Sequence, residues 1–213
     1  MPLYTTDALI LRTYTLGESD RIVVFLTRDR GKKRGVAKNA RQSRRRFGGA
    51  LEPLTCGRVA YFERERRELV SLNFVEPTQS PLALADGDAL GHVGYFAELI
   101  DEWAQEADPN ETLFRLGASM VEAMAAGVPI EPLARYFEYW LLRLQGVYES
   151  EARISPGALA FLRSARTCSP FALTEIAVSQ DVLRELEGAH RTLIAMHLEK
   201  DLKSARVLRE MRR

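Results

Sequence analysis

The sequence predicts a two-domain α+β protein, in which a five-stranded β-barrel of the OB type precedes an all-α helical domain. Alternating, β-branched segments occupy residues 3–76, and beyond Pro77 the apolar residues recur at spacings of three and four. Charge divides at the same place: residues 1–78 carry a net charge of +7, and residues 79–213 carry −6. We therefore expect a nucleic-acid-binding barrel over 1–78 and a partner-binding helical domain over 79–213.

Five short strands are expected in the first part, and turn residues such as Asp29-Arg30-Gly31 separate them. In the second strand, Val24 should lie on one face and Val23 and Phe25 on the other. Short turns and one long loop, residues 39–50, are typical of an OB barrel, although the alternation alone would equally permit an SH3-like barrel. The expected strands cover residues 3–14, 21–28, 32–38, 54–64 and 68–76.

Helical periodicity follows Pro77. The segment 131–144 is apolar over most of two faces, so we place its helix centrally. Ser155-Pro156 is an N-terminal capping pair, and either Thr174 or Ser179 should open the last long helix. The basic tail, DLKSARVLREMRR, continues or follows that helix. The other expected helices cover residues 82–107, 111–126 and 155–166.

The most unusual stretch is residues 28–46, which hold ten Arg or Lys and one acid, Asp29. Such a run repels itself unless a polyanion or counterions neutralise it. We expect a short strand with Val36 facing inward and the cations facing water. A solvated charged surface is the plain alternative. The density of cations favours contact with a nucleic-acid backbone.

Aromatic residues near this run have two open roles. Phe47 follows three arginines and precedes two glycines, so it either stacks on a base or folds back onto the barrel core, and we favour the core. Tyr61 and Phe62 point to opposite faces of one strand, so one of them should be buried.

No catalytic constellation is evident, and we expect no enzyme activity, no cofactor and no metal. His190 and His197 lie seven positions apart with Glu187 nearby, but solvated or capping histidines are favoured over a metal site. Cys56 and Cys168 belong to no CxxC pair, which suits reduced thiols in the cytoplasm. We see neither a secretory signal nor a membrane-spanning segment.

The order of several segments resembles the RecO family of bacterial recombination mediators. The segments GESDRI, RGVAKNAR and FGGALEP carry the resemblance together, and LARYFEYWLLRLQG and ISPGALAFLR extend it over nearly the whole chain. The resemblance implies an OB domain followed by a helical domain. It also implies DNA repair by recombination in the bacterial cytoplasm and nucleoid, binding of single- and double-stranded DNA, strand annealing, and cooperation with RecR to load recombinase on strands covered by SSB.

The family's site residues carry over onto this chain by position. Arg135 matches an arginine that, in the family, docks the acidic and apolar C-terminal tail of SSB, and a surface salt bridge to Glu131 or Glu138 is the alternative. The residues that match or adjoin the DNA-contacting region are Lys32, Lys33, Arg34, Lys38, Arg41, Arg44, Arg45 and Arg46.

The chain departs from the family pattern in one respect. Many members carry a cysteine-rich insertion, often a four-Cys zinc site, where this chain has only residues 147–153 and no cysteine. We therefore expect no structural zinc. The leading hypothesis is a non-enzymatic DNA-binding mediator, and its rival is an adaptor whose basic loop meets an acidic protein surface.

Overall fold

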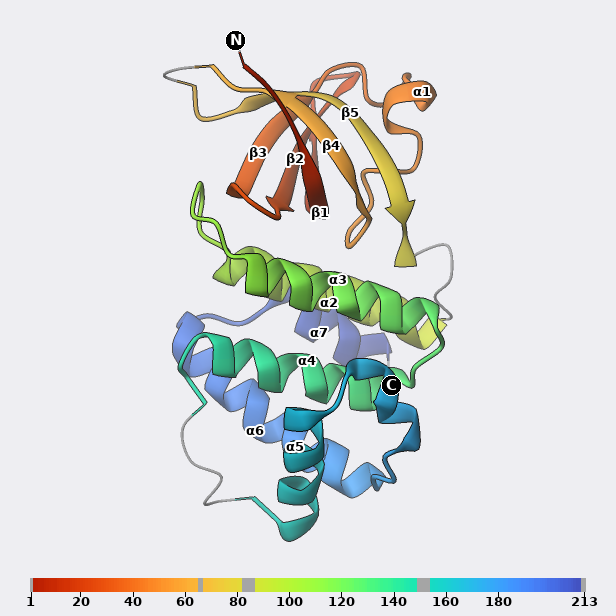
Figure 1. Ribbon diagram of the computed structural model, residues 1–213, viewed down its shortest axis with the longest axis vertical. Coiled ribbons are helices and arrows are strands. Elements are labelled where there is room, and N and C mark those ends of the chain that lie inside the picture. The colour runs from red at the N-terminus through yellow and green to blue at the C-terminus, as the bar shows by residue number, and fades with distance from the viewer. Residues whose placement is uncertain (1, 65–66, 82–86, 149–153, 212–213) are drawn as a thin grey trace.

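The structure, a computed structural model, describes residues 2–64, 67–81, 87–148 and 154–211 (Figure 1). Within these residues the five strands come first, with one four-residue helix among them, and the long helices follow, so the predicted mixed α+β class is confirmed. The strands are β1 (Leu3–Leu16), β2 (Asp20–Thr27), β3 (Gly31–Ala37), β4 (Cys56–Phe62) and β5 (Val70–Gln79).

The five strands close into a barrel in the order β1-β2-β3-β5-β4. The long β1 pairs antiparallel with both β4 and β2, and its register shifts between Ile10 and Arg12. A bulge of this kind bends a strand, which lets β1 serve both neighbours. A short parallel pairing of β3 with β5, from Gly35 opposite Val70 to Ala37 opposite Leu72, completes the closure.

Side chains from all five strands fill the barrel interior. Tyr61 is fully buried there whereas Phe62 is only half-buried, as the alternation requires. The expectation that Val36 faces inward was wrong. Ala37 takes the inward position and Val36 lies half-buried on the outer wall. Small residues suit the inside of β3, because even a Cβ on Gly35 would lie 2.9 Å from Cγ2 of Val70.

Helices make up most of the rest of the described chain, and two of them start at predicted caps. Ser155 and Ser179 each accept a hydrogen bond from a backbone amide of the first turn, so Ser179 and not Thr174 opens the last long helix. Asn110, which was not predicted as a cap, accepts the same kind of bond at the start of the helix that begins at Glu111. The expected start at residue 82 lies outside the described residues. The helices are α2 (Gly87–Trp103), α3 (Glu111–Ala125), α4 (Ile130–Leu144), α5 (Pro156–Thr167), α6 (Gln180–Leu198) and α7 (Lys203–Met211), with a 3-10 turn at Pro170–Glu175.

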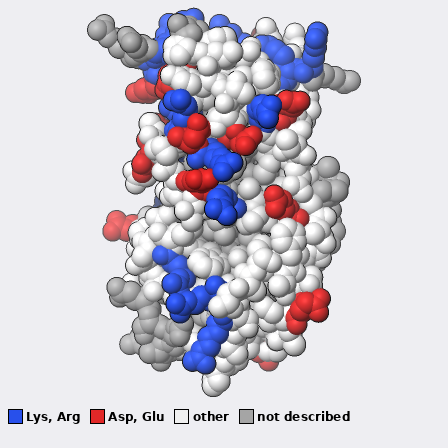
Figure 2. All heavy atoms as spheres, viewed as in Figure 1, with Lys and Arg blue, Asp and Glu red and all other residues white. Residues whose placement is uncertain are grey.

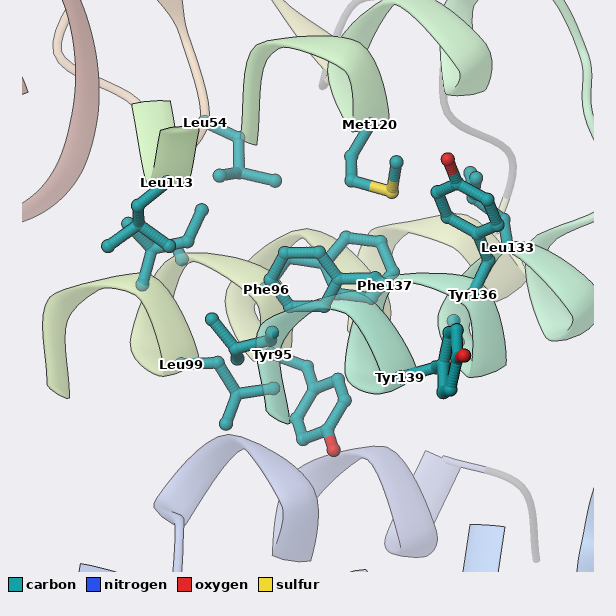
Figure 3. Packing of buried hydrophobic residues seen from close by; sticks show 14 of the residues in the cluster. Leu54, Tyr95, Phe96, Leu99, Leu113, Met120, Leu133, Tyr136, Phe137 and Tyr139 are labelled. Carbon is teal, nitrogen blue, oxygen red and sulfur yellow. The ribbon is translucent and has the colours of Figure 1, made fainter. Parts of the chain in front are cut away.

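Helix α4 is central, as predicted, and packs against α2, α3, α5 and α6. Figure 3 shows its aromatic side chains between the neighbouring helices. The ring of Phe137 lies 4.6 Å from that of Phe96 on α2, measured between centroids. The basic tail does not extend α6. Glu199 adopts a left-handed conformation, φ 53°, and the chain turns back so that α7 lies against α2.

The barrel and the helices share one apolar core at their junction. Leu9, Leu26 and Leu54 of the barrel belong to the same buried cluster as Leu99 and Ile100 of α2. Helices α2 and α3 lie directly across this end of the barrel (Figure 1). The alternation predicted for β2 is therefore confirmed, because one of its faces fills the barrel and the other meets the helices.

Candidate nucleic-acid interface

The basic run divides into two parts, and the first part faces the helical half. Nζ of Lys32 lies 2.6 Å from the backbone oxygen of Asp101 and 3.1 Å from its Oδ1. Only 15% of the Lys32 side chain is exposed. Arg34, two residues further along the same face of β3, has Nη1 4.0 Å from Oε1 of Glu106. These two predicted DNA contacts are thus paired with carboxylates from the helical half.

Lys33 points to the other face of β3, as strand alternation requires. Its Nζ lies 2.9 Å from Oε1 of Glu63, which follows β4, and 12% of the lysine side chain is exposed. All three predicted cations within β3 are therefore matched by acids.

The second part of the run, residues 38–46, lies at the end of the barrel that points away from the helices. Its loop is held by the turn between β1 and β2. The backbone amide of Asn39 donates to Oδ1 of Asp20 at 2.8 Å, and the amide of Arg41 donates to the backbone oxygen of Ser19 at 3.2 Å. Nη1 of Arg41 also donates to the backbone oxygen of Glu18 at 3.0 Å. The loop is an ordered feature, because these bonds fix its course.

A short helix, α1 (Arg44–Phe47), closes this loop. It was not predicted, since four residues are too few to show a helical period. Arg46 braces it, with Nε donating to Oγ of Ser43 at 3.1 Å and Nη2 to the backbone oxygen of Lys38 at 2.5 Å. Phe47 is 3% exposed and belongs to the barrel core, so the favoured prediction for it is confirmed.

Four cations of this second part, Lys38, Arg41, Arg45 and Arg46, form what we call the distal cation group. Within the described residues, none of them makes an ion pair with a carboxylate. Arg44 lies on α1 between them, and its side chain is outside what the structure describes. Figure 2 shows Lys and Arg gathered along this end of the barrel, whereas basic and acidic side chains intermingle near the junction with the helices. The distal cation group can therefore meet an external anion.

Arg135 has a different environment from the one expected. Only 1% of its side chain is exposed, so it is not a surface cation, and Nη2 lies 3.0 Å from Oε1 of Glu138. Glu187 is 3.9 Å from Nη1, while Nη1 and Nε have no hydrogen-bond partner in the described structure. A small opening leads from this cluster to the surface, and its charged lining residues are Arg135, Arg191, Arg209, Glu138 and Glu187.

The two histidines singled out as chemical candidates differ in exposure. His190 is fully buried with Nδ1 3.0 Å from Oε2 of Glu138, so it is not a solvated histidine. His197 is exposed in the last turn of α6, as expected of a solvated histidine, and its ring stacks on that of Trp103 with centroids 5.6 Å apart. Burial raises the pKa of the Cys56 thiol to about 12. The described residues contain no group of three His, Cys, Asp or Glu that could hold a metal ion.

Sequence reasoning missed the ion pairs at the junction. Arg12 of β1 approaches Asp101 at 3.4 Å and Glu98 at 3.9 Å, and Arg28 pairs with Glu111 at 2.8 Å. Glu98 and Asp101 are three residues apart and so lie on one face of α2, which was the available signal. The sequence does not show that this face meets the barrel. None of the described helices is long and apolar enough to cross a bilayer.

The fold and the distal cation group together define a class: a β-barrel protein with a basic end, joined to a helical bundle. Family models described as "Recombination protein O N terminal" and "Recombination protein O C terminal" match residues 1–81 and 84–150. The chain therefore belongs to the RecO family.

Curated relatives agree with this assignment. A protein of Koribacter versatilis named "DNA repair protein RecO" is 45% identical over 149 residues, which make up 68% of this chain and 59% of that protein. A protein of the same name from Anaeromyxobacter is 40% identical over 65% of this chain and 55% of its own length. The matches thus span little more than half of these two relatives. A third, from Pelotomaculum thermopropionicum, is 29% identical over 96% of this chain and 93% of that protein.

Proposed function

We propose that this chain is a non-enzymatic DNA-binding mediator of DNA repair, whose barrel binds the phosphate backbone through the distal cation group. The observation that carries the proposal is the arrangement of these cations on an ordered loop, unpaired with any described acid. Cations placed in this way gain binding free energy by releasing the counterions of a polynucleotide. The names of the curated relatives support a role in DNA repair.

The barrel suits this role if it is of the OB type. In support, β1 pairs with both β2 and β4, and β3 closes the barrel by pairing with β5 in parallel. OB barrels commonly hold oligonucleotides on their strand faces and connecting loops. We propose that residues 1–78 form this module and residues 79–213 the helical one. We leave Lys32, Lys33 and Arg34 out of the distal cation group, because each already lies within 4.0 Å of a carboxylate of this chain. Their ion pairs stabilise the side of the module.

Strand annealing and recombinase loading would follow from the same surface. A basic end that neutralises the phosphates of two strands lowers the repulsion that opposes their pairing. We propose both single- and double-stranded DNA as partners, together with RecR and the SSB tail through the helical half.

The experiment reverses charge at the distal cation group. In the variant Lys38→Glu/Arg41→Glu/Arg45→Glu, we expect affinity for a labelled oligonucleotide to fall at least about a hundredfold. The slope of log affinity against log salt should flatten by roughly 0.7 for each lost phosphate contact on a single strand. Fluorescence anisotropy over a salt titration measures both quantities.

The matched control replaces three exposed arginines of the helical half with Glu, and so changes the net charge by the same amount as the first variant. These residues are Arg163, Arg166 and Arg206. DNA affinity should fall much less in this control, and circular dichroism should be unchanged in both proteins. Equal losses in the two variants would show that only net charge matters. Binding that survives the first variant, beside capture of an acidic protein by the wild type, would favour the adaptor.

For the SSB tail we propose the opening at Arg135. A C-terminal carboxylate would meet the exposed Arg191 and Arg209 at the mouth, above the buried guanidinium of Arg135. Arg191→Glu/Arg209→Glu should weaken binding of a labelled SSB tail peptide by about tenfold or more, measured by anisotropy, whereas Arg163→Glu/Arg166→Glu should not. Unchanged binding in the first variant would place the tail elsewhere.

A further inference from the structure

A pocket of about 510 Å³ lies on the outer wall of the barrel, where β3 ends and β5 begins. Its origin is the short pairing between these two strands. The parallel register covers only Gly35 to Ala37 opposite Val70 to Leu72. At one end of it β3 continues into Lys38 and the distal loop, and at the other end the residues before Val70 lead back to the β4–β5 connection. The pocket lies over the outer side of this short pairing, between Lys38 and that connection.

The chemistry of the pocket walls is mixed. Val36 and Ser71 stand opposite each other in the pairing and, with Leu69, give it an apolar floor with one hydroxyl. Of the residues that the structure describes, Lys38, Arg64 and Arg67 line it beside one carboxylate, Glu68. Three cations around a half-apolar hollow suit a ligand with a flat apolar part that carries negative charge on both sides.

We propose that this pocket takes one unpaired nucleobase of single-stranded DNA, while Lys38, Arg64 and Arg67 contact the phosphates that flank it. The inference rests on the proposed DNA-binding function and names how the strand is read. Lys38 joins the pocket to the distal cation group, so one strand can lie across both. Paired and stacked bases cannot enter a pocket, and the site therefore distinguishes single strands from duplex.

The experiment compares three labelled probes on the full chain by anisotropy: oligo-dT, a strand of the same length with abasic sites throughout, and a blunt duplex. The wild type should bind oligo-dT about tenfold more tightly than the abasic strand, because the abasic strand has no base to bury against the apolar floor. Val36→Trp, which fills the pocket without changing charge, should abolish that difference and leave abasic and duplex binding intact.

Two further variants make the outcome decisive. Thr5→Trp places the same side chain at an exposed position of β1 and should behave as the wild type. Leu69→Ser removes part of the apolar floor and should reduce the preference for oligo-dT even if Val36→Trp fails to fold. Equal binding of oligo-dT and the abasic strand by the wild type would overturn the pocket while leaving phosphate binding in place. A wild type that binds none of the probes would overturn the proposed function as well.

Discussion

Single residues in the helical core form an ionic cluster that hydropathy does not reveal. The side chain of Glu138 is 2% exposed and pairs with Arg135. Its Oε2 lies 3.0 Å from Nδ1 of His190, and its Oε1 accepts a hydrogen bond from the hydroxyl of Tyr95 at 2.8 Å. Burial raises the pKa of Glu138, but the attraction of Arg135 and the hydrogen bonds from His190 and Tyr95 outweigh burial. The pKa of this carboxyl therefore lies below its ordinary value of 4.5.

The cluster predicts the effect of Glu138→Gln. This change leaves the charge of Arg135 buried without its close counter-ion and should lower the free energy of unfolding by about 3–5 kcal/mol, measured by urea denaturation at pH 7. Because the folded-state pKa is depressed, the stability contributed by ionised Glu138 is complete above about pH 4.5 and is lost as the pH falls through the folded-state value. The gap between wild type and variant should accordingly narrow in acid.

Asp181→Asn is the control for that variant. Asp181 pairs with Arg184 at 3.1 Å, but the two side chains are 92% and 74% exposed, so we expect no measurable change. If both substitutions alter stability alike, the buried cluster is not a stabilising centre.

At the scale of elements, strand β3 serves two surfaces along its length. Its first residues lie against the helical half, where the amide of Lys32 donates to the backbone oxygen of Gln105 and its own backbone oxygen accepts from the amide of Ala107. Its last residues lead into the distal loop and floor the outer pocket. One strand thus joins the barrel to the helices at one end and presents cations at the other.

The start of helix α7 is capped by a single side chain of α2, while Leu208 packs α7 into the apolar core. Glu98 of α2 accepts hydrogen bonds from the backbone amides of Lys203 and Ser204 and from the Ser204 hydroxyl, at the start of α7. A carboxylate at this position satisfies free amides and complements the helix dipole. These bonds hold the pKa of Glu98 below its ordinary value even though burial raises it. The tail is therefore part of the helical bundle.

At the scale of the whole molecule, the barrel and the helices behave as one packed unit. Gly117 of α3 lies so close to the barrel that a Cβ would be 2.7 Å from Cδ2 of Leu9 and 2.8 Å from Cδ1 of Ile100. Gly31, with φ 68°, approaches the backbone of Asp108 in the same way, since a Cβ there would lie 2.4 Å from the amide nitrogen of Asp108. Close approach of this kind means that neither half can shift without the other.

Gly117→Val tests this coupling. We expect the wild type to unfold in one calorimetric transition, and the variant to show a lower midpoint with the barrel and helical transitions separated, because overpacking typically costs about 1–3 kcal/mol. Gly94→Val is the matched control, since Gly94 is also helical but a Cβ there meets nothing within 4 Å. Identical scans for the two variants would mean that the junction is loosely packed.

The sequence alone was enough to predict the strands, the long helices and the charge of the basic run, because these depend on neighbours along the chain. Alternation in residues 20–27, the caps at Ser155 and Ser179, and the density of cations after Arg28 all belong to that local information. Tertiary structure decided which cations remain available. Lys32 pairs with Asp101 and Arg34 approaches Glu106, both acids about seventy residues away in the chain. Arg135 is buried, and the opening beside it is lined by α2, α6 and α7. Pairing and burial depend on which surfaces meet, and that is set only when the chain packs.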